Sequence, residues 1–196
     1  MRPILVVYAT REGHTRAIAE HVAASLRQAG AVPEVIDAAH PPADLDLARY
    51  EAVILAASIH AGKHEREMTD FVRNRRDALE RLPTVLLSSS LTEAGAEDPQ
   101  QSPERRDAAR AEVGRMIDEF FEQTGWRATI ARPIAGALLY TQYGWFMRLV
   151  MKRIVKGQGG NTDTSRDYDY TDWVALDRFV TELLASNFRP EPSAVA

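Results

Sequence analysis

The stretch ILVVYATREGHTRAIAEHV, residues 4–22, decides the fold of this chain. Its first part, Ile4–Ala9, is a continuous apolar run, which is typical of a strand buried on both faces. A polar loop follows at residues 10–15, and from Ile18 apolar residues recur as on one face of a helix that ends near Gly30. The stretch therefore predicts a strand, a loop and a helix, which together begin a βαβ unit.

The same alternation continues along the chain. Further strands are expected at residues 34–37, 52–57, 84–88 and 129–137. Helices are expected at residues 15–29, 66–82 and 103–124, and a last one begins near Thr171 and Asp172. Strands that alternate with helices form parallel sheets covered on both faces. The pattern predicts an α/β fold with a five-stranded doubly wound parallel sheet, in the strand order 2-1-3-4-5.

Composition places the chain among globular proteins. Of its 196 residues, 45% are hydrophobic and 27% charged, which suits one domain at residues 1–188 and a flexible tail at 189–196. Without cysteine there is no thiol nucleophile or cysteine-ligated cluster, so redox chemistry would need an organic cofactor. We expect a cytoplasmic protein without a membrane-spanning helix, and the net charge of −4 does not favour nucleic acid as a partner.

The first loop predicts a phosphate site. It leads from a strand into a helix N-terminus, where free backbone N–H groups favour an anion. Neither the three-glycine dinucleotide fingerprint nor the nucleoside triphosphate loop occurs in it. The alternative is that its two threonines serve only as a strand end and a helix cap. The candidate phosphate-binding residues are Thr10, Arg11, Gly13, His14 and Thr15.

Two further loops follow the third and fourth predicted strands, at the same edge of the sheet. Their candidate ligand-binding residues are Ser58, His60, Ala61, Gly62, Ser89 and Ser90. His60 and Lys63 could act on a ligand, although loop residues of these types are usually only solvated. His60 and His64 have the spacing of a metal pair, but no third ligand is apparent. We therefore predict no metal and no catalytic side chain.

A basic segment lies between the fifth strand and the last helix, within an insertion at residues 139–170. Residues 131–162 contain no acidic residue and five basic ones. At helical spacing one face would be apolar and the other basic, a pattern typical of a helix in a membrane interface. An ordinary surface helix is the alternative. The residues expected on the membrane or quinone side are Trp145, Arg148, Lys152, Arg153 and Lys156.

The first loop also carries a family resemblance. YATREGHT resembles the flavin mononucleotide (FMN) phosphate loop of flavodoxins, T-x-T-G-x-T, with Glu12 in place of the middle threonine. A carboxylate would repel phosphate, so Glu12 is expected to turn to solvent. The resemblance implies a flavodoxin-like fold and FMN rather than FAD. Flavodoxins usually hold the flavin ring between aromatic residues, which both later loops lack.

A second resemblance covers most of the chain outside residues 93–110. IAGALLYTQYGWFMRLVMKRI and GGNTDTSRDYDYTDW are similar to the C-terminal region of the menaquinone-dependent protoporphyrinogen IX dehydrogenase family. This implies oxidation of protoporphyrinogen IX to protoporphyrin IX in haem biosynthesis, three two-electron cycles, and electron transfer to a membrane quinone (menaquinone or ubiquinone). It also implies peripheral binding to the anionic inner face of the cell membrane. A flavodoxin-like NAD(P)H:quinone reductase and a non-enzymatic electron carrier are the alternatives.

Overall fold

The computed structural model describes residues 2–139 and 163–189 of the chain. The described strands are β1 (Ile4–Ala9), β2 (Pro33–Asp37), β3 (Ala52–His60), β4 (Lys63–His64), β5 (Thr84–Ser90), β6 (Ile130–Ala135), β7 (Ala137–Leu138) and β8 (Tyr168–Asp169). The described helices are α1 (His14–Gln28), α2 (Arg66–Leu79), α3 (Leu91–Glu97), α4 (Pro103–Thr124) and α6 (Trp173–Ala185), with a 3₁₀ turn at Leu47–Arg49.

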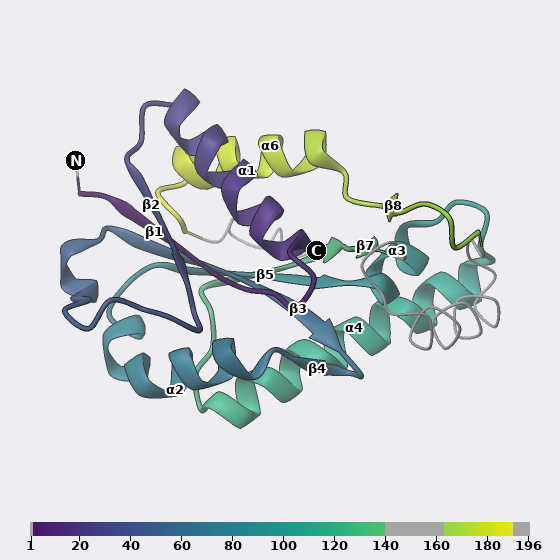
Figure 1. The fold of residues 1–196 in the computed structure, drawn as a ribbon, viewed down its shortest axis with the longest axis horizontal. Coiled ribbons are helices and arrows are strands. Elements are labelled where there is room, and N and C mark those ends of the chain that lie inside the picture. Colours follow the sequence, from purple (N-terminus) through teal and green to yellow (C-terminus); the bar gives the residue numbers. More distant parts are fainter. Residues whose placement is uncertain (1, 140–162, 190–196) are drawn as a thin grey trace, which may run out of the picture.

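The main sheet is parallel and doubly wound. Its strand order is β2-β1-β3-β5-β6, which is 2-1-3-4-5 when the five long strands are counted along the chain, so the predicted topology is confirmed. The short β4 pairs antiparallel with the end of β3. Figure 1 shows α1 and α6 on one face of the sheet and α2 and α4 on the other.

The apolar side chains of β1 pack against the helices on both faces of the sheet. Successive side chains of a strand point to opposite faces of the sheet. Leu5 and Val7 accordingly join the cluster formed with α2 and α4, whereas Ile4 and Val6 join the cluster formed with α1 and α6. All four side chains are fully buried, which explains why β1 reads as a continuous apolar run rather than an alternating one.

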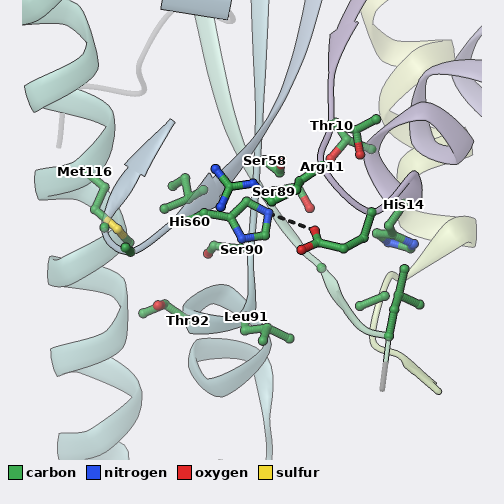
Figure 2. A pocket seen from close by; sticks show the side chains of 18 of the residues that line it. Thr10, Arg11, His14, Ser58, His60, Ser89, Ser90, Leu91, Thr92 and Met116 are labelled. Carbon is green, nitrogen blue, oxygen red and sulfur yellow. Dashed lines mark ion pairs between the residues drawn. The ribbon is translucent and has the colours of Figure 1, made fainter. Parts of the chain in front are cut away.

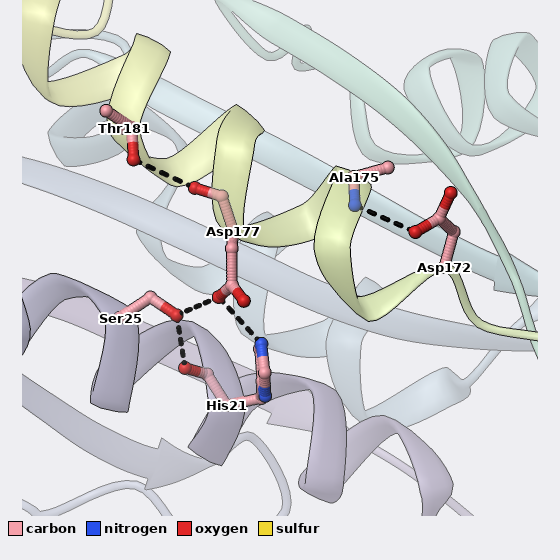
Figure 3. Close-up of polar contacts among 6 residues, drawn as sticks. All are labelled: His21, Ser25, Asp172, Ala175, Asp177 and Thr181. Atoms are coloured by element: carbon pink, nitrogen blue, oxygen red, sulfur yellow. Dashed lines mark hydrogen bonds and ion pairs between the residues drawn. The ribbon is translucent and has the colours of Figure 1, made fainter.

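Polar contacts connect the two helices on one face of the sheet. Asp177 of α6 accepts hydrogen bonds from Ser25 Oγ and, at 2.8 Å, from His21 Nε2 of α1 (Figure 3). At the start of α6, the Asp172 carboxylate accepts a hydrogen bond of 2.8 Å from Ala175 N and so caps the helix, which begins where the sequence predicts. The contacts of Asp177 hold the first half of α6 against the middle and the C-terminal half of α1.

The helix α3 was not expected from the sequence. It begins at the end of β5, where Ser90 Oγ accepts a hydrogen bond from Glu93 N at 3.1 Å. The spacing of Ser90 and Glu93 is the S-x-x-E pattern of a capping box, a signal that could have located this helix. α3 packs on α4, and the two helices form one wall of the candidate site.

Candidate functional site

A cavity of about 380 Å³ lies at the carboxyl edge of the sheet. Its walls come from the loop after β1, the ends of β3 and β5, the helices α3 and α4, and residues 136–139 (Figure 2). In a doubly wound sheet, ligands bind outside the carboxyl ends of the strands at the change of strand order. The cavity occupies that position.

The loop after β1 presents a helix N-terminus without a side-chain cap. Gly13 is the N-cap of α1, and its φ of 90° is a left-handed conformation that glycine adopts without strain. In contrast, side-chain oxygens of Ser90, Ser102 and Asp172 cap α3, α4 and α6. The first turn of α1, which is fully described, also contains no acidic residue. This helix end is therefore suited to an anion.

The two threonines of this loop have different surroundings. Thr10 Oγ1 accepts a hydrogen bond from Gly13 N at 3.0 Å, which closes the loop. Thr15 lines the cavity with only 1% of its surface exposed. Because Gly13 is the N-cap, the alternative role of Thr15 as the helix cap is wrong.

The loop after β3 is a tight hairpin. β3 extends to His60, and residues Ala61 and Gly62 connect it to β4. Both have positive φ, 49° for Ala61 and 78° for Gly62, as a two-residue hairpin turn of the primed type requires. The turn holds His60 at the strand end, and its side chain lines the cavity (Figure 2).

Charged side chains from three elements meet beside His60. Its Nε2 lies 2.9 Å from Glu12 Oε2 and 3.4 Å from Glu65 Oε1. Arg11 Nη2 contacts the other oxygen of Glu65 at 3.2 Å. The expectation that Glu12 turns to solvent is wrong: its side chain is 22% exposed, lines the cavity and contacts His60. The pairing with imidazole gives this carboxylate a favourable partner away from the helix end.

Serines at the ends of β3 and β5 form the floor of the cavity. Ser58 Oγ is buried and has no hydrogen-bond partner within the described residues. Gly136 approaches closely, since a Cβ there would lie 3.2 Å from Ser89 Oγ. A buried hydroxyl without a partner beside a cavity indicates a place for a polar ligand atom.

His14 connects the first loop to the segment before α6. Its Nε2 lies 2.8 Å from Thr171 Oγ1 and 3.6 Å from Asp169 Oδ1. The Thr171 hydroxyl donates to Ala135 O at 2.8 Å, so it accepts from His14, and Nε2 carries a proton. Burial lowers the pKa of His14, and the nearby Asp169 opposes that shift. Trp173, the first residue of α6, is partly buried and donates from Nε1 to Asp169 Oδ2 at 3.0 Å.

His64 faces the interior and takes no part in the cavity. Its Nε2 forms a hydrogen bond of 2.9 Å with Ser88 Oγ, and its ring contacts Phe120. Burial lowers its pKa from an ordinary value of 6.5 to about 4. Residues 2–139 and 163–189 contain no group of three side chains that could hold a metal ion.

The structure brings the predicted cofactor residues together. All of them except Gly13 line the cavity, and Gly13 shapes the helix end beside it. Sequence reasoning missed the wall opposite the first loop, formed by Leu91, Thr92, Glu112, Met116 and Leu139. Trp145, Arg148, Lys152, Arg153 and Lys156 lie outside the described residues.

The sheet order, the uncapped helix end and the cavity beside it define a flavodoxin-like protein, and comparisons with known proteins agree. The Flavodoxin domain profile matches residues 5–165. The flavodoxin of Streptococcus pneumoniae TIGR4 superposes with a TM-score of 0.51 at 19% identity, over 93% of this chain and 98% of that one. A single-residue mutant of flavodoxin from Pseudomonas aeruginosa gives a TM-score of 0.52 at 14% identity, over 94% of this chain and 97% of that one.

Sequence similarity to two relatives identifies the family more specifically. Protoporphyrinogen IX dehydrogenase (quinone) of Escherichia coli (strain K12) is 30% identical over 186 residues, which cover 95% of this chain and 97% of that protein. The Leishmania major protein of the same name is 31% identical over 192 residues, or 97% of this chain and 76% of that protein. The chain belongs to this family of flavodoxin-domain proteins, and it is a flavin-dependent oxidoreductase.

FMN is the cofactor, and the site fits it. The uncapped N-terminus of α1 suits a single phosphate group. Ser58 Oγ supplies an unused polar group for a second part of the molecule.

Proposed function

We propose that this protein oxidises protoporphyrinogen IX to protoporphyrin IX and passes the electrons to a membrane quinone. The observation that carries the proposal is the length of the alignment with the Escherichia coli enzyme, which covers 95% of this chain and 97% of that protein. The two flavodoxins also align over 93–94% of this chain but at only 14–19% identity, so it is the 30% identity over this length that sets the relationship with the dehydrogenase apart from a shared fold. The names of both relatives state the substrate and the acceptor for those proteins.

In this proposal, one set of described side chains holds the phosphate of FMN and a second set orients its ring. The phosphate is held by the first-turn amides of α1 with the side chains of Thr10, Arg11, His14 and Thr15. The ring is oriented by Ser58, His60, Ala61, Gly62, Ser89 and Ser90. Bound FMN supplies an acceptor for two electrons at a time. The neutral His14 imidazole, fixed by Thr171, orders the phosphate loop rather than adding charge to it.

The walls of the cavity favour a bulky substrate. Among the described residues that line it, none is Phe, Tyr or Trp, so no aromatic side chain there would cover the flavin ring. Leu91, Met116 and Leu139 give the far wall an apolar surface. Such a surface suits a large, flat tetrapyrrole that must lie against the ring.

The acceptor half of the proposal requires contact with a membrane. In the parts of the chain that the structure covers, no helix is both long and apolar enough to cross a bilayer. We therefore place the contact on the basic segment, where Arg148, Lys152, Arg153 and Lys156 would face anionic lipid. Trp145 would lie at the headgroup level.

An anaerobic experiment tests the substrate directly. The FMN-loaded protein is mixed with protoporphyrinogen IX while flavin and porphyrin absorption are recorded. Loss of flavin absorption with appearance of porphyrin is expected, and quinone in vesicles should then restore the oxidised flavin. If NADPH bleaches the flavin rapidly and protoporphyrinogen IX does not, the protein is instead an NAD(P)H:quinone reductase. Stable flavin with both reagents would favour an electron carrier.

A further inference from the structure

We propose that His60 accepts the proton that the substrate loses in each oxidation cycle, and that Glu12 holds the His60 ring for this task. This inference rests on the proposed function, because it concerns the same cavity and the same substrate. It assigns a definite catalytic role to a side chain that the sequence places among the candidate ligand-binding residues.

The position of His60 satisfies the first requirement of a proton acceptor. It is the last residue of β3, held by the hairpin turn through Ala61 and Gly62, and its side chain is 27% exposed and lines the cavity. In Figure 2 its ring projects into the cavity between Met116 and His14. A group placed there reaches both a bound substrate and solvent, so it can take a proton and release it.

The two ring nitrogens of His60 have different surroundings. Carboxylate oxygens only accept hydrogen bonds, so Nε2, 2.9 Å from Glu12 Oε2 and 3.4 Å from Glu65 Oε1, carries a proton. The contacts of His60 with described residues are made through Nε2, and none involves Nδ1. In the neutral ring Nδ1 then bears the free electron pair. A carboxylate on one nitrogen and an open second nitrogen is the arrangement that orients a histidine base.

The charges around His60 suit the protonated product. The charged groups in contact with it are Glu12 from the loop after β1 and Glu65 from the start of α2, and Arg11 neutralises the far oxygen of Glu65. Lys63, which pairs with His60 across the hairpin, is exposed. The Glu12 carboxylate is therefore the negative group nearest the ring. Glu65 Oε1 is buried and accepts no hydrogen bond from a described residue. An imidazolium formed at His60 therefore has a counterion already in contact.

The proposed step balances atoms and electrons. In each cycle a C–H bond at a bridging carbon breaks, and its hydrogen leaves with both electrons as hydride to FMN. The accompanying proton passes to Nδ1 of His60, from a pyrrole N–H in two cycles and from the fourth bridging carbon in the remaining one, so that four C–H and two N–H bonds break in total. The electron pair left behind by each proton enters the new π bond. The imidazolium then releases its proton to solvent, and the quinone finally takes up two electrons and two protons.

The test compares His60→Gln and Glu12→Gln with His40→Gln, a control at an exposed histidine that does not line the cavity. The rate of flavin reduction by protoporphyrinogen IX should fall by about 10²-fold or more in His60→Gln, the usual contribution of a base. Glu12→Gln should lose about tenfold, because the ring is then less well oriented.

Two further measurements distinguish a catalytic role of His60 from a purely structural one. Calorimetric titration of the apoproteins with FMN should show affinity changes of about tenfold at most in His60→Gln, the value of one ordinary hydrogen bond. In His60→Gly, added imidazole should restore flavin reduction in a saturable manner. If wild-type protein oxidises protoporphyrinogen IX and His60→Gln matches its rate, the role of His60 is wrong while the function stands. A wild-type protein that does not oxidise this substrate overturns both proposals.

Discussion

The hydroxyl of Thr15 tests whether the first loop holds the phosphate of FMN. Thr15 lines the cavity, is almost fully buried, and lies in the uncapped first turn of α1. Thr15→Ala should weaken FMN binding by about 1–3 kcal/mol, the loss for a hydrogen bond to a charged group. Calorimetric titration of the apoprotein with FMN measures this change in affinity. Thr181→Ala, on the exposed face of α6, is the control. Unchanged affinity would mean that the hydroxyl serves only the fold.

His64 should make the folded state sensitive to acid. Its pKa of about 4 in the folded protein lies below the ordinary 6.5 that applies in the unfolded chain. Between these values the unfolded chain binds more protons, so the free energy of unfolding falls as pH drops from 6.5 to about 4. The loss contributed by this residue is about 3 kcal/mol.

Urea denaturation of wild type and His64→Gln at pH 7 and near pH 4 isolates this contribution. Carboxylates also titrate in this range, but they do so in both proteins. The wild type should therefore lose more stability than the variant on acidification. Equal losses in the two proteins would show that His64 is not the buried neutral group that the structure describes.

The β3–β4 hairpin needs a glycine at position 62 because of its backbone conformation and not because of crowding. Gly62 has a φ of 78°, and a Cβ there would meet no heavy atom within 4 Å. Gly114, inside α4, has equally open surroundings. Gly62→Ala should destabilise the fold by about 1–2 kcal/mol because of left-handed strain. Gly114→Ala should stabilise it by about 1 kcal/mol because alanine is the better helix former.

Chemical denaturation of the two glycine variants gives a matched comparison, since both add one methyl group to open space. Changes of opposite sign are expected. If Gly62→Ala is as stable as wild type, the turn adopts another conformation, and the position assigned to His60 loses its support.

The sequence predicts the long elements well and their ends poorly. The five long strands are readable because their apolar runs fill the two helical layers. β3 and β5 continue to His60 and Ser90, beyond their predicted ends at residues 57 and 88. Their last residues include polar side chains that line the cavity, so they carry no apolar signal. The helix α3 escapes a periodicity search because Ala96 is its one buried residue.

The sequence predicts where the candidate site lies better than it predicts the contacts between its side chains. Parallel pairing of β1 with β3, with Ala9 opposite Ala57, brings the first two loops to one edge, as the topology requires. The contact between Glu12 and His60 depends on side-chain conformations across that edge. No local pattern encodes them. The predicted residues consequently share one cavity, whereas the charged cluster beside His60 emerges only from the three-dimensional structure.

The distribution of charge over the whole protein gives the last prediction. A chain with a net charge of −4 concentrates five basic residues and no acidic ones in residues 131–162. If Arg148, Lys152, Arg153 and Lys156 face anionic lipid, each contributes about 1 kcal/mol near the surface. Replacing all four with Gln should therefore reduce binding to anionic vesicles by about two orders of magnitude or more at low salt. High salt should weaken the wild type in the same direction, because it screens these contacts.

A second quadruple variant controls for net charge. Gln at Arg66, Arg76, Arg105 and Arg127, four exposed residues outside the basic segment of the sequence, removes the same charge and should leave vesicle binding nearly unchanged. In the first variant, FMN affinity and flavin reduction by substrate should persist, because the cavity walls stay intact. Transfer of electrons to a quinone in vesicles should fall. If that variant binds vesicles like the wild type but loses FMN or unfolds, the basic segment serves the fold and the membrane half of the proposed function is wrong.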